Sequence, residues 1–333
     1  MKKFMYTRIL IVCSLLFLTA CASTENGEGS SDGNETIYFL TKVLGNQYWS
    51  VVEEGANAAA KELGVDIVVT GLANEAEVEK QVQQLQDAVS AGASGIVVGP
   101  TDSTAMANPV SEAFQSGIPI VIVDTMINTE DYSVALMTDN VEAGREAAET
   151  MLELLKNRGI SESEEIKVGV QIGASGSQTI IDRLSGFNEY WDLHAPDTWQ
   201  VLNEDIKVND GDITKAVGFT QDMLTAYPTL KAVFGPNNGS TVGFVTGLME
   251  ANRTDITLVG FDFSSEIEDM IRTEAYDVAT ILQKQYLMGY EGVKQAVELA
   301  RGIEPDQKVV DTGTMVITKD NIDDPEIADI INP

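Results

Sequence analysis

The chain has 333 residues, which is enough for two domains of about 150 residues each. Its 52 acidic and 21 basic side chains give a net charge of −31, and so acidic a surface disfavours nucleic acid as a partner. The only cysteines are Cys13 and Cys21, and the only histidine is His194, which we expect in a surface loop. We therefore expect neither a metal site nor a cofactor, and a monomer stabilised by core packing.

The first residues predict an export signal. A basic start is followed by an apolar run over 9–18 that is too short to span a membrane, and then by small residues. Leu18-Thr19-Ala20-Cys21 resembles a bacterial lipobox, in which the cysteine is acylated after cleavage; the alternative is an ordinary signal peptide that happens to precede a cysteine. We expect a signal peptide over 1–20 and a lipidated flexible tether over 21–35, which places the protein on the extracytoplasmic face of the cell membrane.

From residue 36 onward, short β-branched runs alternate with helical patterns, which is typical of βαβ units and parallel sheets. The first half predicts strands at 37–42, 66–70, 95–99 and 119–123 and helices at 48–63, 75–91 and 104–115. The second half predicts helices at 140–158, 177–193, 212–226, 240–251, 265–272 and 285–301 and strands at 167–172, 199–206, 231–235, 256–261, 277–282 and 309–318.

The two halves are similar to each other. Val98-Gly99-Pro100-Thr101-Asp102 matches Phe234-Gly235-Pro236-Asn237-Asn238, and one apolar strand in each half ends in an aspartate, Asp124 or Asp262. Buried strands share their composition, so chance similarity is the alternative. Two similar α/β lobes are the simpler interpretation.

Polar side chains follow the predicted strands, at the edge where open parallel sheets bind ligands. They are Asn46, Tyr48, Trp49, Asp124, Arg183, Asn237 and Asp262. A carboxylate accepts hydrogen bonds from two adjacent hydroxyls, a guanidinium donates in a planar fork, and aromatic rings offer flat faces to a sugar. Alternatively, the aspartates are helix caps and the aromatic residues belong to the core.

Seven segments in order, from about Ile37 to about Thr318, resemble the ribose-binding-protein family of periplasmic binding proteins. They are Gly45-Asn46-Gln47-Tyr48-Trp49, the strand ending in Asp124, Thr138-Asp139-Asn140, Asp182-Arg183-Leu184-Ser185-Gly186-Phe187, Ala232-Val233-Phe234 with Asn237, Val259-Gly260-Phe261-Asp262, and Ala279-Thr280-Ile281-Leu282-Gln283. The resemblance implies two Rossmann-like lobes with parallel sheets that close over a ligand by a three-segment hinge, the periplasmic binding protein type I fold. It also implies that sugar hydroxyls are hydrogen-bonded by Asn46, Asp124, Arg183, Asn237, Asp262 and Gln283 and that Tyr48 and Trp49 stack on the sugar.

The same resemblance implies the domain boundaries and the partners. One lobe would comprise 36–138 and 284–312, and the other 139–283 and 313–333. The partners would be a small sugar or polyol and the permease and ATPase subunits of an ABC importer. At two positions the chain departs from the ribose binders: it has Thr125 where they carry an arginine and Gly211 where they place an aromatic ring.

Three other functions compete with import. A sugar-sensing repressor of this architecture would need a basic helix-turn-helix head, whereas the chain starts with a lipobox and an acidic linker. An enzyme is disfavoured because there is no Gly-rich nucleotide motif, because Gly173-Ala174-Ser175-Gly176 lacks the spacing of a nucleophile elbow, and because a closing cleft suits binding better than glycoside hydrolysis by Asp124 and Asp262. A sensor that presents the ligand to a chemoreceptor or sensor kinase stays open.

Overall fold

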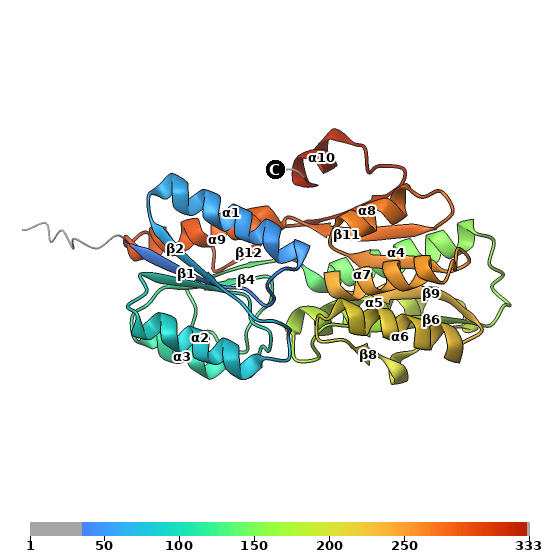
Figure 1. The fold of residues 1–333 in the computed structure, drawn as a ribbon, viewed down its shortest axis with the longest axis horizontal. Helices are drawn as coiled ribbons and strands as arrows, with labels where there is room; N and C mark the ends of the chain where they lie inside the picture. Colours follow the sequence, from blue (N-terminus) through green and yellow to red (C-terminus); the bar gives the residue numbers. More distant parts are fainter. Residues whose placement is uncertain (1–34, 332–333) are drawn as a thin grey trace, which may run out of the picture. The chain divides into compact units, whose positions relative to one another are not determined.

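The computed structural model describes residues 35–331, in which two α/β lobes each surround one sheet (Figure 1). The first lobe contains β1 (Thr36–Leu40), β2 (Asp66–Thr70), β3 (Gly95–Val98), β4 (Ile120–Val123), β5 (Val134–Met137) and β12 (Val309–Asp311), with helices α1 (Gln47–Leu63), α2 (Val78–Ser90), α3 (Ala107–Gln115) and α9 (Gln285–Ala300). Helices α1 and α9 cover one face of this sheet and α2 and α3 cover the other.

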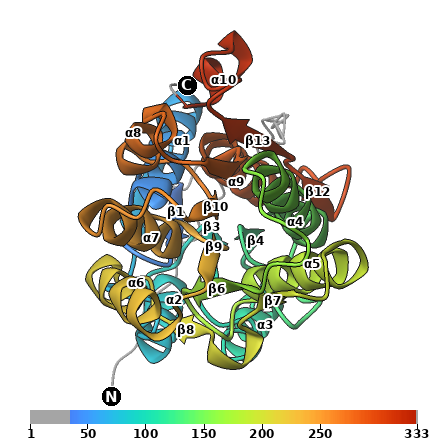
Figure 2. The ribbon, with the colours of Figure 1, turned by 90° about the vertical axis from the view of Figure 1, so that its right-hand side faces the viewer.

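The second lobe repeats this plan. Its strands are β6 (Ile166–Ile172), β7 (Trp199–Val201), β8 (Lys207–Val208), β9 (Leu230–Gly235), β10 (Thr257–Phe261), β11 (Val278–Gln283) and β13 (Thr314–Thr318). Its helices are α4 (Asn140–Asn157), α5 (Gln178–His194), α6 (Ile213–Ala226), α7 (Asn238–Glu250), α8 (Ser265–Arg272) and α10 (Pro325–Ile331), with a 3₁₀ turn at Asn203–Asp205. Figure 2 shows α4 and α5 on one side of the sheet and α6, α7 and α8 on the other.

The two sheets are wound in the same order, which confirms the predicted fold class. The first has the strand order β12-β5-β4-β3-β1-β2 and the second β13-β11-β10-β9-β6-β7, with β8 added beside β6. All pairs are parallel except β11 with β13. The chain passes between the sheets after β5, after β11 and between β12 and β13, so three segments connect the lobes.

Glycines bring corresponding helices together in the two lobes. Helix α1 packs on α9 in the first lobe, and α4 packs on α5 in the second. At four glycines in these helices an added Cβ would stand only 1.8 to 2.2 Å from a carbonyl oxygen of the facing helix. They are Gly55, Gly289, Gly144 and Gly186. Each helix pair can approach so closely only because these positions have no side chain.

The structure corrects several predicted elements. Strand β5 was not predicted because its four residues are all buried, and so short a run shows no periodicity. The single strand predicted over 309–318 is two strands in different sheets, because Gly313 turns the chain with φ of 78°. The strand predicted over 199–206 is interrupted by the 3₁₀ turn, and α10 was not predicted.

The predicted signal segment, Cys21 and nearly all of the predicted tether lie outside the described residues. Over residues 35–331, the structure contains no helix that is both long and apolar enough to cross a bilayer. Packing in this part rests on four apolar clusters, two in each lobe.

Candidate functional site

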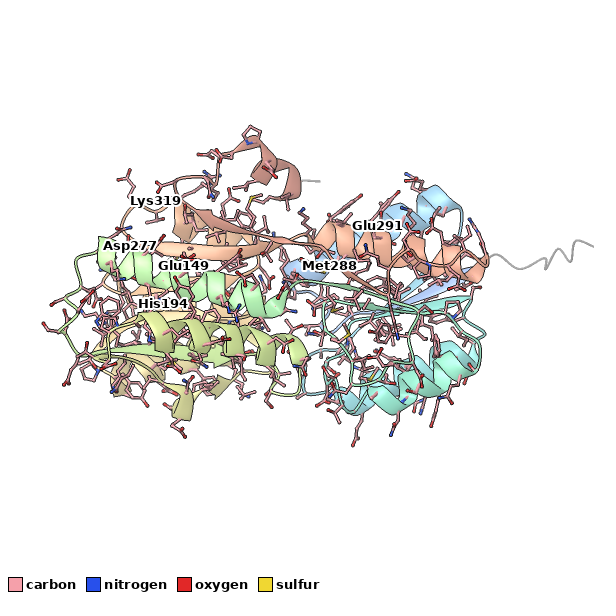
Figure 3. The ribbon with its side chains drawn as sticks, turned by 180° about the vertical axis from the view of Figure 1, so that it is seen from behind. Glu149, His194, Asp277, Met288, Glu291 and Lys319 are labelled. Carbon is pink, nitrogen blue, oxygen red and sulfur yellow. The ribbon has the colours of Figure 1, made fainter. Side chains whose placement is uncertain are left out.

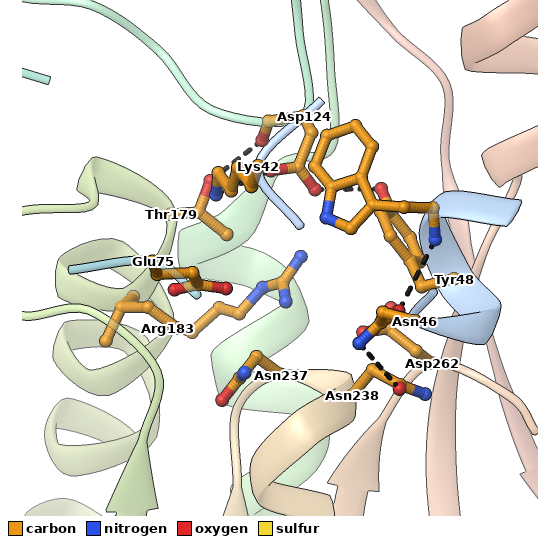
Figure 4. A pocket seen from close by; sticks show the side chains of 12 residues that line it. Lys42, Asn46, Tyr48, Glu75, Asp124, Thr179, Arg183, Asn237, Asn238 and Asp262 are labelled. Carbon is orange, nitrogen blue, oxygen red and sulfur yellow. Dashed lines mark hydrogen bonds and ion pairs between the residues drawn. The ribbon is translucent and has the colours of Figure 1, made fainter. Parts of the chain in front are cut away.

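A small buried cavity lies between the two lobes, and each lobe contributes six of its twelve lining residues (Figure 4). The first lobe supplies Lys42, Asn46, Tyr48, Trp49, Glu75 and Asp124, and the second supplies Thr179, Ile180, Arg183, Asn237, Asn238 and Asp262. The cavity has a volume of about 30 Å³, roughly twice what one water molecule needs. The cleft is therefore closed in this structure, and side chains of the two lobes fill most of it.

Seven of the eight predicted ligand-binding residues line this cavity. Gln283 does not line it. Its amide nitrogen donates to the Asp262 carboxylate at 2.7 Å, and its amide oxygen accepts from the Thr138 hydroxyl at 2.9 Å. Thr138 lies in the segment that connects β5 to α4, so Gln283 joins a cavity carboxylate to one of the three crossings between the lobes.

Direct hydrogen bonds hold the two lobes together around the cavity. They join Ser103 to Gly176 at 3.0 Å, Asn46 to Asn238 at 3.0 Å, and the Thr179 hydroxyl to the backbone carbonyl of Asp124 at 2.8 Å. Gly176 fits only because it has no side chain, since an added Cβ would stand 2.0 Å from the Asp102 carboxylate of the other lobe. The close fit across the cleft therefore depends on small residues as well as on hydrogen bonds.

The two aspartates occupy equivalent places in the lobes. Asp124 directly follows β4 and Asp262 directly follows β10, and both have left-handed backbone conformations with φ of 65° and 71°. Such a conformation is uncommon outside glycine and is found more often at functional sites than elsewhere. Neither residue caps a helix, since Ser264 supplies the cap of α8 and no helix begins directly after Asp124.

Asp124 is held by three side chains of its own lobe. The Tyr48 hydroxyl donates to it at 2.8 Å, the Thr125 hydroxyl donates at 2.8 Å, and the Lys42 ammonium lies 2.8 Å from it. Burial has the largest effect and raises the pKa of this carboxyl, but the charges of Lys42 and Arg183 and the hydrogen bonds from Lys42 and Thr125 together hold the pKa below its usual value. Asp124 is therefore firmly ionised at neutral pH.

Lys42 was not predicted as a site residue. It follows β1 and is 6% exposed, and its ammonium also reaches the Thr125 hydroxyl. It thus places a cation beside both Asp124 and Thr125. A lysine directly after a buried strand was the signal that could have identified it, since a buried lysine needs a partner.

The pKa of Asp262 is shifted in the opposite direction. Burial raises the pKa of its carboxyl from 3.8 to about 6, although the Arg183 guanidinium and the hydrogen bond from Gln283 partly oppose the rise. Arg183 itself is 2% exposed and lies 3.9 Å above the Phe261 ring. It donates to the Asn140 amide oxygen at 2.9 Å and to the Pro236 carbonyl at 2.7 Å.

Two buried donors at the cavity have no partner within the described residues. They are Nη2 of Arg183 and Nδ2 of Asn238, and the two residues are 2% and 4% exposed. A buried donor without an acceptor costs about 1 to 3 kcal/mol, so native structures contain few of them. Two in the same small cavity indicate that this site is built for a ligand that carries acceptor oxygens.

The aromatic residues belong to both the core and the cavity. Tyr48 and Trp49 are 3% and 4% exposed, lie edge to face with centroids 5.3 Å apart, and pack in an apolar cluster of the first lobe. Gly99 makes room for Trp49, because an added Cβ there would stand 2.5 Å from the indole ring. The two rings thus line the cavity from within a packed environment, and their stacking on a sugar stays a prediction.

The other candidate residues lie away from this cavity. His194 is the exposed last residue of α5 rather than a loop residue, and its ring packs on Tyr190 (Figure 3). Ser175 is exposed and does not line the cavity. Among residues 35–331 there is no group of three or more His, Cys, Asp or Glu side chains arranged to hold a metal ion.

Comparisons with known proteins agree with this architecture. Residues 37–304 match the model of the periplasmic binding protein domain family. The ribose import binding protein of Salmonella typhimurium is 28% identical over 285 residues, which cover 86% of this chain and 91% of that protein.

Two solved structures are similar along most of the chain. The carbohydrate transporter solute-binding protein from Agrobacterium radiobacter, in complex with D-arabinose, has a TM-score of 0.84 at 29% identity and covers 91% of this chain and 100% of its own. An ABC transporter solute-binding protein from Agrobacterium vitis with bound D-fucose has a TM-score of 0.81 at 28% identity, covering 88% and 98%.

Two equivalent lobes, three connections and a polar cavity at the carboxyl ends of both sheets define a two-lobed solute-binding protein. The family model matches most of the chain, and the chain therefore belongs to the periplasmic binding protein domain family.

Proposed function

We propose that this protein binds a monosaccharide or a similar small polyhydroxyl compound in the cavity and delivers it to the permease of an ABC importer. One observation carries the proposal: carboxylates, amides, two unpartnered donors and two aromatic rings from both lobes converge on a single buried site. Each hydroxyl of a sugar both donates and accepts, so a set that mixes acceptors and donors suits it. The sugars named with the similar proteins support this ligand class.

The residues divide by role. Asp124 and Asp262 accept from hydroxyls, whereas Arg183 and Asn238 donate to hydroxyl oxygens through their unpartnered nitrogens. Asn46 and Asn237 add amide contacts, and Tyr48 and Trp49 pack against the carbon side of the ring. For Gln283 we propose a positioning role instead of the expected direct contact, because its amide is committed to Asp262 and Thr138.

Ligand entry requires the cleft to open, because a cavity of about 30 Å³ is too small for a sugar ring. We propose that the three crossings, near residues 138, 283 and 312, form the hinge and divide the lobes as predicted from the sequence. Closure would bury the ligand and strengthen its hydrogen bonds. A permease could then distinguish the occupied protein by its closed shape, since a ligand shifts the equilibrium by its differential affinity for the two states.

The location follows from the family in part. Periplasmic binding proteins work outside the cytoplasm, and we propose in addition that Cys21 carries a lipid that tethers this monomer to the membrane surface. Mass spectrometry of the N-terminal peptide from membrane-extracted protein tests this. A Cys21 peptide with the mass of a diacylglycerol adduct supports the tether, and a free thiol on a soluble protein contradicts it.

A thermal-shift screen of neutral pentoses, hexoses and cyclic polyols tests the ligand class. A compound at about a hundred times its dissociation constant adds about 2.7 kcal/mol to the folded state, which gives a clear shift. We expect at least one such compound to stabilise the protein, Asp262→Ala to abolish the shift, and Asp192→Ala, on the exposed side of α5, to preserve it. Stabilisation by amino acids or peptides alone would contradict the proposal, and turnover of a glycoside would favour an enzyme.

A further inference from the structure

Glu75 is a cavity residue that neither the predicted strand ends nor the family resemblance indicated. It lies in the loop between β2 and α2 and is partly buried. Figure 4 shows its carboxylate pointing toward the space between Lys42 and Arg183. Burial raises the pKa of this carboxyl, and the nearby Lys42 only partly opposes the rise.

Two glycines of the opposite lobe leave the space that this side chain occupies. A Cβ added to Gly211 would stand 3.3 Å from Cγ and 3.4 Å from Oε1 of Glu75. A Cβ added to Gly173 would stand 2.6 Å from Oε2 of Glu75 and 2.9 Å from the amide nitrogen of Asn237. A larger residue at Gly173 would displace the carboxylate, whereas one at Gly211 would crowd it by a few tenths of an ångström and would itself be strained at φ of 75°.

The backbone fixes the loop in the same place. The Glu75 amide donates to the Asp210 carbonyl of the other lobe at 2.9 Å. Asp210 and Gly211 form a turn in which both residues have left-handed φ angles, 58° and 75°. The Asn209 amide oxygen stabilises this turn by accepting from the Gly211 amide at 3.0 Å. In the closed form the loop is thus anchored across the cleft, in addition to its hydrogen bonds within its own lobe.

Glu75 differs from the other acids of the cavity in having no partner. Asp124 has Lys42 and Asp262 has Gln283, but the Glu75 carboxylate makes no hydrogen bond or ion pair with any side chain in the described part of the chain. An ionised carboxylate that is partly removed from water needs donors. Both cations of the cavity face Asp124 and Asp262, so a ligand hydroxyl is a donor that this carboxylate can take up in place of water.

We propose that Glu75 determines specificity: its carboxylate accepts a hydrogen bond from a ligand hydroxyl at the edge of the cavity that faces Gly211. The inference rests on the proposed function. Because Gly211 places no side chain here, the Glu75 carboxylate makes this edge of the cavity selective for a polar group. The bound compound therefore carries a hydroxyl that points toward Glu75, and analogues without that hydroxyl bind weakly.

A cycle of protein and ligand variants tests this. The neutral monosaccharide or polyol that most stabilises the wild type, and each of its monodeoxy analogues, are titrated by calorimetry into wild type, Glu75→Gln, Glu75→Ala and the control Glu79→Gln. Glu79 is an exposed residue at the start of α2, outside the cavity. We expect one monodeoxy analogue to lose about 10- to 100-fold in affinity for wild type and for Glu79→Gln, and less than about 3-fold for Glu75→Ala.

The outcomes separate the two proposals. If the parent compound binds but every monodeoxy analogue loses the same factor with Glu75→Ala as with wild type, Glu75 has no specific ligand hydroxyl and the inference is wrong. If no polyhydroxyl compound binds wild type, the proposed function fails and this inference fails with it. Unchanged melting temperatures of the ligand-free Glu75 variants would show that lost binding does not reflect lost folding.

Discussion

Replacing Asp262 by asparagine should stabilise the ligand-free protein and abolish ligand binding. The carboxyl is 3% exposed, and its pKa in the folded protein is about 6 instead of 3.8. This rise of roughly two pH units corresponds to about 3 kcal/mol, at about 1.4 kcal/mol per unit. It already includes the favourable effect of Arg183, so it measures the net cost of holding Asp262 ionised in the closed cleft.

The sign follows from proton binding. Between about pH 4 and 6 the folded state binds the Asp262 proton more tightly than the unfolded chain does. The free energy of unfolding therefore decreases as the pH rises through this window, and the full cost is present above about pH 6. Asparagine has no charge to desolvate, tolerates the left-handed conformation at φ of 71°, and can still accept from Gln283 through its amide oxygen.

Urea unfolding of wild type and Asp262→Asn from pH 4 to 7.5, without ligand, measures the effect. At pH 7.5 we expect the variant to be more stable by about 1 to 3 kcal/mol, the lower value applying if the cleft opens and rehydrates the carboxylate. The difference should shrink toward zero near pH 4. A variant that is less stable at pH 7.5, or a difference that does not change with pH, would refute the reasoning.

Three further predictions concern closure and packing. Gly176→Ala should weaken ligand binding about tenfold in calorimetry, because its Cβ would meet Asp102 across the cleft. Adding Asp102→Ala should restore the affinity, and equal affinity of Gly176→Ala and wild type would contradict the prediction. Lys42→Met should lower the free energy of urea unfolding by about 3 kcal/mol, because it leaves Asp124 buried without its cation. The double variant Lys42→Met with Asp124→Asn should have a smaller decrease in the free energy of unfolding. Gly289→Ala should lower the melting temperature by more than about 5 °C, since its Cβ would stand 1.8 Å from a carbonyl oxygen of α1, whereas Gly218→Ala, with open space around it, should not.

Much of the site was predictable because the chain marks where strands end. In a parallel sheet, residues after the strands gather at one edge, so Asp124 and Asp262 could be assigned to the cleft from buried runs alone. Lys42 was missed although it follows β1, and Glu75 was missed because it lies outside this pattern. Glu75 is carried into the cavity by its loop and by two glycines of the other lobe, and neither feature leaves a periodic signal in the sequence.

The prediction of helices and strands was limited in the same way, because an element without a pattern in the sequence is missed. Long helices with one apolar face were predicted within a few residues, whereas β5 was missed because four buried residues carry no pattern. The expected contact from Gln283 illustrates a different problem. The resemblance located it beside the cleft, but only side-chain geometry shows that its amide bonds Asp262 and Thr138, which favours a positioning role over direct contact.

The lobes share a backbone plan but not an electrostatic one. Asp124 and Asp262 follow equivalent strands in the same strained conformation, yet the pKa of one is lowered and that of the other is raised to about 6. The difference arises because Lys42 enters from β1 to pair with Asp124, while Arg183 is spread over Asn140 and Pro236 and compensates Asp262 less. A ligand that closes the cleft therefore meets one carboxylate that is already stabilised and one that gains most from new donors. It follows that Asp262, more than Asp124, should couple ligand binding to closure.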